Sequence, residues 1–146
     1  MKTLRQQGRA FALQLLYQTE IGQTADAGSQ ERFWQNSKAS KKAGLFARGL
    51  VEQTLANREE IDRTLTAVMD QWRLERLSVV VRNVLRLGAC EIRIIATEPV
   101  AVVINEAVEL TRTFMDEDSA RFVNSVLDRL HRRSDNPLPP PAAETG

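Results

Sequence analysis

Cysteine and histidine are almost missing from this chain, since Cys90 and His131 are the only residues of their kinds. A single thiol cannot form an intramolecular disulfide or a site built from several thiolates, and it fits a protein of the reducing cytoplasm. Most catalytic triads and transition-metal sites need more imidazole than one histidine supplies. Glycine-rich phosphate loops, paired-histidine motifs and Cys-x-x-Cys pairs are also missing. We therefore predict no enzymatic activity, no cofactor and no metal.

Long hydrophobic runs are missing as well, because arginine and glutamine interrupt the apolar residues near the N-terminus. No stretch has the length of a signal-peptide core or a membrane span, so we expect no membrane association. The formal net charge of the 146 residues is only +1. Any affinity for nucleic acid therefore has to come from local clusters of charge.

Apolar residues recur at spacings of three and four over most of the chain, which predicts helices and no strands. The segment 77–96 is apolar almost all round and is predicted to be a helix in the middle of a bundle. The proline-rich end predicts a disordered tail. We expect one helical domain over residues 1–134 and the tail over 135–146. The predicted helices span about residues 3–21, 41–56, 57–72, 77–96, 99–114 and 119–133, with a short docked helix at Phe33 and Trp34.

Two predicted helices begin with capping signals. Asn57 followed by Glu60 is typical of an N-cap with its reciprocal acidic residue. The acidic residues 116–118 precede the last helix, where we interpret them as capping and dipole partners and not as a metal site. Pro99 suits the first turn of the preceding predicted helix, which spans residues 99–114. That helix is predicted to bury one face, formed by Val100, Val103, Ile104, Ala107, Val108 and Phe114.

Positive charge gathers at the start of the first predicted helix. Lys2, Arg5 and Arg9 lie on one helical stripe, and no acidic residue precedes Glu20. The helix dipole disfavours cations there by roughly 0.3–1 kcal/mol per exposed residue, so an anionic partner would relieve the arrangement. Backbone N–H groups at the same end can bind phosphate. The alternative is a basic surface that only aids solubility.

Four segments resemble the NusB family of transcription antitermination proteins, in the order and spacing of that family. They are residues 9–17 (RAFALQLLY), 84–92 (VLRLGACEI), 104–110 (INEAVEL) and 118–128 (DSARFVNSVLD). The resemblance implies a bundle of about seven helices in two subdomains. It also implies a role in suppressing termination during transcription of ribosomal RNA, together with other Nus factors and RNA polymerase.

The same resemblance implies an RNA ligand and a protein partner. In the family, a heterodimer with the ribosomal protein NusE recognises the single-stranded boxA element of the transcript. Arginines beside aromatic rings suit single-stranded RNA, although Phe122 could equally belong to the core. The residues that would contact RNA are Lys2, Arg5, Arg9, Tyr17, Asp118, Arg121 and Phe122. Those expected at the partner contact are Glu75, Leu77, Val81 and Arg82.

One position departs from the family pattern in a way that bears on function. Val81 stands where an acidic residue is common, at a position implicated in the contact with the ribosomal protein. The alternative function is therefore a divergent protein-interaction module of the same fold, or a homodimer, with an altered partner and weak RNA binding.

Overall fold

The computed structural model describes residues 3–22, 31–32, 40–69 and 73–134, and every regular element within these ranges is helical. The all-α class predicted from periodicity is confirmed. Lys2, the expected short helix at Phe33 and Trp34, and the tail lie outside the described residues. The elements are α1 (Leu4–Glu20), α3 (Lys41–Ala56), α4 (Arg58–Val68), a 3₁₀ turn η1 (Leu74–Arg76), α5 (Val79–Cys90), a π-helical turn η2 (Glu91–Ile95), α6 (Val100–Phe114) and α7 (Glu117–Ser134).

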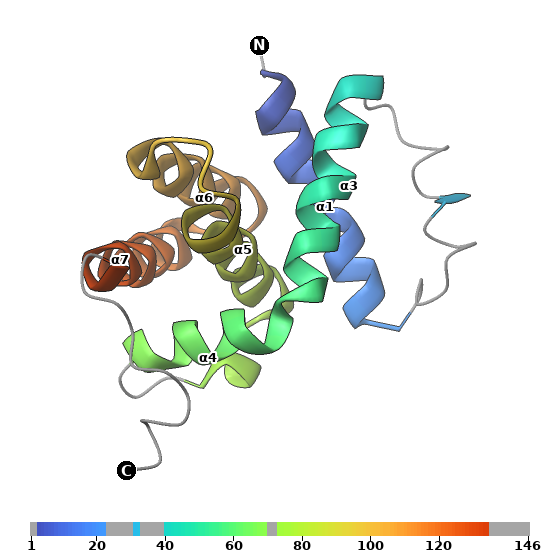
Figure 1. Cartoon of the computed structure of the whole chain (residues 1–146). Helices are drawn as coiled ribbons and strands as arrows, with labels where there is room; N and C mark the ends of the chain where they lie inside the picture. The colour runs from blue at the N-terminus through green and yellow to red at the C-terminus, as the bar shows by residue number, and fades with distance from the viewer. Residues whose placement is uncertain (1–2, 23–30, 33–39, 70–72, 135–146) are drawn as a thin grey trace.

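Helix α5 forms the centre of the bundle, because it packs against α1, α3, α4, α6 and α7. Figure 1 shows α1 and α3 side by side, with α5 between that pair and the pair formed by α6 and α7. Nine of the twelve residues of α5 are buried, which confirms the prediction that this apolar segment occupies the middle. Its buried polar residues need internal partners, since an unpaired charge in a core is costly.

The helix predicted for residues 77–96 is not α-helical to its end. After Cys90 the chain continues as the wider π-helical turn η2, which stops at Ala96 in the left-handed region with φ 51°. A π-helical turn is often found where a helix has to re-aim a functional side chain. Here Glu91, the first residue of η2, is buried inside the bundle.

The two predicted capping signals had different outcomes. Asp116 accepts a hydrogen bond from the backbone N–H of Ser119 at 2.7 Å, and this bond lowers the pKa of the Asp116 carboxyl. The interpretation of this residue as a cap is therefore confirmed. Asn57 is the N-cap residue of α4, as predicted, but the predicted side-chain cap is missing, because its side chain donates to the carbonyl of Gln53 at 2.8 Å. Asn57 is the single residue between α3 and α4, and its side chain bonds to the helix that ends there.

The ends and faces of two helices also differ from expectation. Helix α4 stops at Val68, before the predicted end at residue 72. Helix α6 buries Val103, Ala107 and Thr111, whereas Phe114 is exposed. The buried stripe of α6 is thus narrower than the apolar stripe in its sequence. Among the described residues, no helix is both long enough and apolar enough for a membrane span.

Close packing of α5 against α7 depends on Gly88, in the last turn of α5. A Cβ atom at Gly88 would lie 2.8 Å from Cδ1 of Leu127, which is fully buried and has little room to turn away. By contrast, a Cβ atom at Gly49 on the exposed side of α3 would meet no atom within 4 Å. The two glycines therefore differ in what a methyl group would do.

We predict that Gly88→Ala lowers the free energy of unfolding by about 1–3 kcal/mol, because the added methyl group overpacks the contact with Leu127. The matched change Gly49→Ala should raise it by about 0.5–1 kcal/mol, since alanine favours a helix interior and meets no obstacle there. Urea unfolding followed by circular dichroism measures both values. Equal effects of the two substitutions would contradict this account of the packing.

Candidate nucleic-acid interface

The start of α1 has its own polar groups largely satisfied. Thr3 and Gln6 form a capping box, in which the Thr3 hydroxyl accepts from the Gln6 N–H at 3.1 Å and the Gln6 side chain accepts from the Thr3 N–H at 2.9 Å. The side-chain nitrogen Nε2 of Gln6 also donates to Glu106 on α6 at 2.9 Å. Gln6 therefore anchors the helix start to α6.

Arg9 is buried, with 5% of its surface exposed, and its guanidinium is held by two carboxylates. Both oxygens of Glu91 accept hydrogen bonds from it at 2.8 Å, and Oε2 of Glu98 accepts a third at 3.2 Å. Burial alone would lower the pKa of Arg9, but the hydrogen bonds and charges of Glu91 and Glu98 raise it. The side chain is therefore a fixed cation inside the fold.

Arg5 lies one turn earlier on α1 and is much more accessible. Its side chain is 43% exposed, and Nη1 lies 3.3 Å from Oε1 of Glu98. The guanidinium carbons of Arg5 and Arg9 lie 5.2 and 5.6 Å from the ring centre of Phe46 on α3, within the range of a cation–π contact. Gly8 permits this approach, because a Cβ atom there would lie 2.5 Å from Cδ2 of Phe46.

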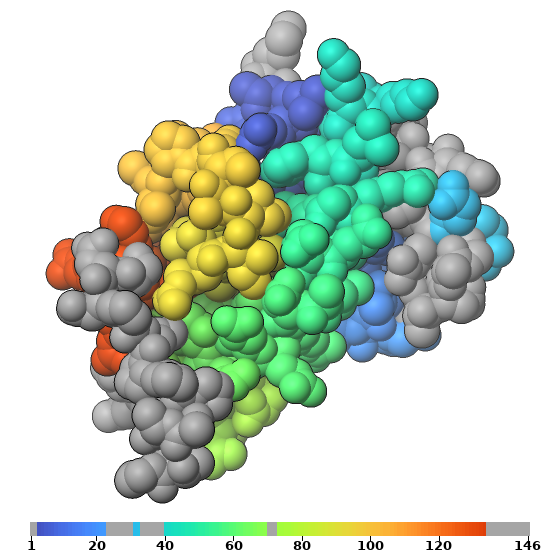
Figure 2. Space-filling view, in the orientation of Figure 1, coloured from blue at the N-terminus to red at the C-terminus, as the bar shows by residue number. Residues whose placement is uncertain are grey.

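These contacts place the two predicted phosphate-binding arginines together but give them different roles. Arg5 remains available at the surface, where Figure 2 shows the start of α1 between α3 and the segment joining α5 to α6. Arg9 does not present its guanidinium to solvent, so the expected direct contact of Arg9 with phosphate does not fit its position. The anionic partner expected from the sequence is provided for Arg9 by two carboxylates of the fold, Glu91 and Glu98.

The sequence alone did not reveal Glu91, Glu98 or Phe46 as members of this cluster. The turn η2 and the left-handed Ala96 bring Glu91 and Glu98 to the same guanidinium, although they flank a break between helices. One signal was available: Glu91 is the only carboxylate in the largely apolar segment 77–96, and a buried carboxylate requires a cationic partner. Its partner is 82 residues away in the sequence, which no local pattern specifies.

The remaining predicted RNA-binding residues lie on two elements. Asp118 and Arg121 are both exposed near the start of α7 and form an ion pair with each other. Phe122 is half-buried and packs against the core, as the alternative for this residue anticipated. Tyr17 is exposed on α1, twelve residues after Arg5 and so ~18 Å further along the helix axis.

The predicted partner-binding residues surround η1 and the first turn of α5. Glu75 is exposed and Leu77 is half-buried against the core. The side chain of Val81 is 5% exposed and faces the core, so it is not available to a partner. Arg82 donates to the backbone carbonyl of Leu77 at 2.6 Å and pairs with Glu20, and it therefore ties η1 to α5 and to the end of α1.

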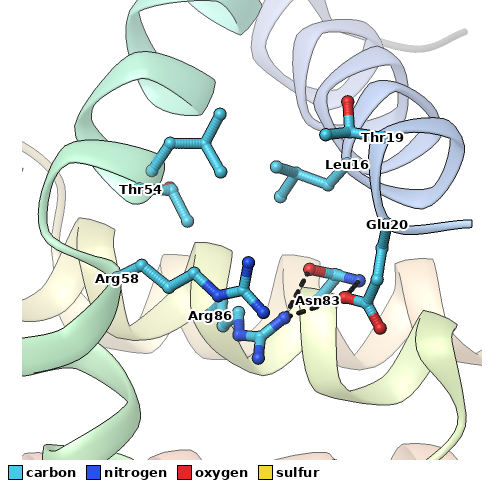
Figure 3. A pocket seen from close by; sticks show the side chains of 8 residues that line it. Leu16, Thr19, Glu20, Thr54, Arg58, Asn83 and Arg86 are labelled. Atoms are coloured by element: carbon cyan, nitrogen blue, oxygen red, sulfur yellow. Dashed lines mark hydrogen bonds and ion pairs between the residues drawn. The ribbon is translucent and has the colours of Figure 1, made fainter. Parts of the chain in front are cut away.

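Glu20 is the centre of a second group of charged and polar side chains, which we call the Glu20 cluster (Glu20, Arg82, Asn83 and Arg86). Glu20 accepts from Asn83 at 3.1 Å and from Arg86 at 2.9 Å, and Arg86 also binds Asp62 on α4. Figure 3 shows Glu20 and Asn83 at one side of a pocket of about 260 Å³, with Arg58 entering the view from the other side and Arg86 between them. The cluster joins α1, α4 and α5.

Comparison with known proteins gives one consistent family. The model of the NusB family matches residues 6–132. The transcription antitermination protein NusB of Myxococcus xanthus is 44% identical over 130 residues, covering 86% of this chain and 93% of that protein. NusB of T. maritima has a solved structure with a TM-score of 0.80 and 34% identity, covering 90% of this chain and 93% of that one.

A further solved structure contains antitermination factors NusB and NusE in complex with dsRNA. Its matching chain has a TM-score of 0.74 and 27% identity, and the alignment covers 90% of this chain and 98% of that one. The similarity therefore extends over almost the whole described bundle.

We predict that Arg9→Ala lowers the free energy of unfolding by about 3–5 kcal/mol, because it leaves the buried carboxylate of Glu91 without its partner. Arg5→Ala should cost less than about 1 kcal/mol, as expected for a largely exposed ion pair. A double variant, Arg9→Met with Glu91→Leu, should recover part of the loss, since both charges of the buried pair are removed and Glu98 keeps its contact with Arg5. Urea unfolding measures all three, and an equally small effect of Arg9→Ala would argue against a structural role for this pair.

Proposed function

The chain belongs to the NusB family, and from this premise we propose that it binds boxA-type single-stranded RNA of ribosomal RNA leader transcripts as a heterodimer with the ribosomal protein NusE. As a member of that family it is an RNA-binding transcription antitermination factor and not an enzyme. The similar chain solved with NusE and RNA supports the finer proposal. The RNA in that complex is double-stranded, so a test has to compare single-stranded with duplex RNA.

The observation that carries the RNA proposal is the accessible guanidinium of Arg5 at the start of α1. Arg5 contacts the Phe46 ring and Glu98, yet 43% of its side chain is exposed. Single-stranded RNA is commonly held by cations on the phosphates and by aromatic rings that stack on bases. Tyr17 and Phe114 are exposed aromatic side chains on α1 and α6 that could serve as stacking surfaces.

The other residues assigned to RNA take different parts in this proposal. Lys2 precedes the described residues and adds a second cation at the same end of the sequence. Arg121 is exposed on α7 and would contact phosphate, with Asp118 holding it in place. Phe122 would support that surface from the core. Arg9 would hold Glu98 in place inside the fold and would not contact RNA itself.

The proposed contact with NusE involves Glu75, Leu77 and Arg82. Glu75 offers an exposed charge, while Arg82 holds the backbone of η1 in place through its bond to the Leu77 carbonyl. Val81 is buried and contributes to this surface only by fixing the start of α5. Other Nus factors and RNA polymerase would join the same assembly.

The burial of Val81 also favours a second candidate function. A valine that faces the core in place of an acidic residue removes one charge from the proposed partner surface. The second candidate is a protein-interaction module or homodimer of the same fold, with an altered partner and weak RNA binding. It differs from the first candidate in its main activity: binding of the protein partner or of a second copy would be unchanged by the loss of Arg5, and RNA binding would be weak already.

For RNA, we predict that Arg5→Ala weakens binding of a boxA-type single-stranded RNA about fivefold and lowers the slope of log Kd against log salt by about 0.7, because one phosphate contact is lost. The matched control is Arg58→Ala on α4, which removes an arginine that is 50% exposed and is paired with Asp62. The control should leave binding unchanged. Fluorescence anisotropy at two salt concentrations, with and without NusE and with a duplex RNA of the same sequence, measures these values.

Two results of that titration would count against the RNA proposal. One is equal weakening by Arg5→Ala and Arg58→Ala, which would mean that only overall charge matters. The other is an unchanged affinity of Arg5→Ala at both salt concentrations, which would place the RNA elsewhere on the surface.

For the partner, we predict that Glu75→Lys weakens NusE binding about three- to tenfold, because it reverses an exposed charge at the proposed surface. RNA binding by the isolated chain should not fall. Glu52→Lys, an exposed change on α3 with the same charge difference, is the control and should leave NusE binding unaltered. Isothermal titration calorimetry measures the affinities, and an effect of Glu52→Lys as large as that of Glu75→Lys would exclude this surface.

A further inference from the structure

Four side chains at the start of α1 form a row of alternating charge from the core to the surface. In order they are Glu91, Arg9, Glu98 and Arg5, and the side-chain exposures rise along the row, at 5%, 6%, 16% and 43%. The row contains two anions and two cations, so its net charge is zero. Its outermost member is a cation, which leaves the surface end open to one more anion.

The contacts along this row differ in strength. The inner pair is bidentate, with both Glu91 oxygens 2.8 Å from the Arg9 guanidinium. Glu98 divides its two oxygens, with Oε2 at 3.2 Å from Arg9 and Oε1 at 3.3 Å from Arg5. The contact between Glu98 and Arg5 is therefore the weakest in the row and the nearest to solvent, where water and salt screen it.

We propose that Glu98 competes with RNA phosphate for Arg5 and thereby sets the RNA affinity of the isolated chain. This inference rests on the proposed RNA-binding function. The carboxylate of Glu98 already occupies one side of the Arg5 guanidinium, and its negative charge repels a phosphate that approaches the same group. Phosphate binding therefore requires that Arg5 share or release this contact.

Neighbouring carboxylates are poorer candidates for this role. Glu91 is buried and both of its oxygens bind Arg9, so it cannot face RNA. Glu106 accepts a hydrogen bond from the side-chain amide of Gln6, and among the residues that the structure describes it forms no ion pair with either arginine. Glu98 alone in this cluster joins the buried cation to the exposed one.

The competition gives a reason for dependence on a partner. A chain whose accessible arginine is already half-neutralised binds RNA weakly by itself, because fewer counterions are released when it engages phosphate. A partner that contributes its own contacts to the same RNA would offset this loss. Glu98 would then limit RNA binding outside the heterodimer.

The test is a double-mutant cycle with Glu98→Gln and Arg5→Ala, using a fluorescent boxA-type single-stranded RNA. Glutamine keeps an oxygen that can accept from Arg9 but removes the negative charge. We expect Glu98→Gln to bind about three- to fivefold more tightly than the wild type, as fits the loss of a partly exposed ion pair. In the Arg5→Ala background the same substitution should change the affinity less than twofold.

The control for net charge is Asp128→Asn on α7, which also removes a carboxylate from an exposed arginine, Arg132. It should leave the affinity within twofold of the wild type. A tightening by Glu98→Gln that is equally large without Arg5 would overturn the proposal, because it would show general repulsion. Weaker binding by Glu98→Gln would also overturn it, since Glu98 would then position Arg5 for RNA.

A measurement on the wild type keeps the test independent of folding defects in the variants. In an NMR titration of the arginine Nε–H signals, RNA should shift the signal of Arg5 and leave that of Arg9 in place. If the chain binds RNA but the Arg5 signal does not move, the proposed competition is wrong and the proposed function still stands. Failure of the wild type and all variants to bind RNA, with or without NusE, would instead refute the proposed function.

Discussion

The buried pair of Arg9 and Glu91 fixes the position of the first helix in this fold. A cation and a carboxylate that are both nearly inaccessible are tolerable only together, because either one alone would be an unpaired charge in a low-dielectric core. The pair joins α1 to the end of α5 across 82 residues of sequence. Since α5 is the helix against which most others pack, a shift of α1 would break this pair as well as the contacts of α1 with α5.

The opposite end of α1 obeys the same constraint. Glu20, its last residue, receives Arg82, Asn83 and Arg86 from α5, while Leu13, Leu15 and Leu16 are buried between the two charged ends. A helix that is anchored by ion pairs at both ends and by apolar packing between them has little freedom to slide or rotate. The accessible side of α1, which we propose contacts RNA, is therefore held in a fixed position. The Glu20 cluster connects α1 to the first turn of α5, where the proposed partner surface begins.

The sequence was sufficient for the parts of the structure that depend on local periodicity. The bounds of the helix at 41–56, the central place of α5 and the capping role of Asp116 follow from the spacing of apolar and polar residues. It was insufficient where a residue has two local options, as at Asn57, or where the partner is remote, as for Arg9. A helical wheel places Arg5 and Arg9 on the same stripe, but it does not say that a carboxylate from η2 covers one of them. Only the tertiary arrangement separates the two arginines into an exposed group and a buried one.

Two kinds of anion account for the cations at the start of α1. They are carboxylates of the fold for Arg9 and, in our proposal, an RNA phosphate for Arg5. The helix dipole makes a positive charge unfavourable there, and the sequence contains no acidic residue nearby that could compensate it locally. Glu91 and Glu98 compensate Arg9 from another part of the fold, and this is a requirement of stability. Arg5 is compensated only in part, and the remaining electrostatic cost is what an RNA phosphate can remove on binding. In the proposed site, affinity for RNA comes from positive charge on Arg5 that the fold does not fully compensate. The carboxylate of Glu98 determines how much of that charge remains for RNA.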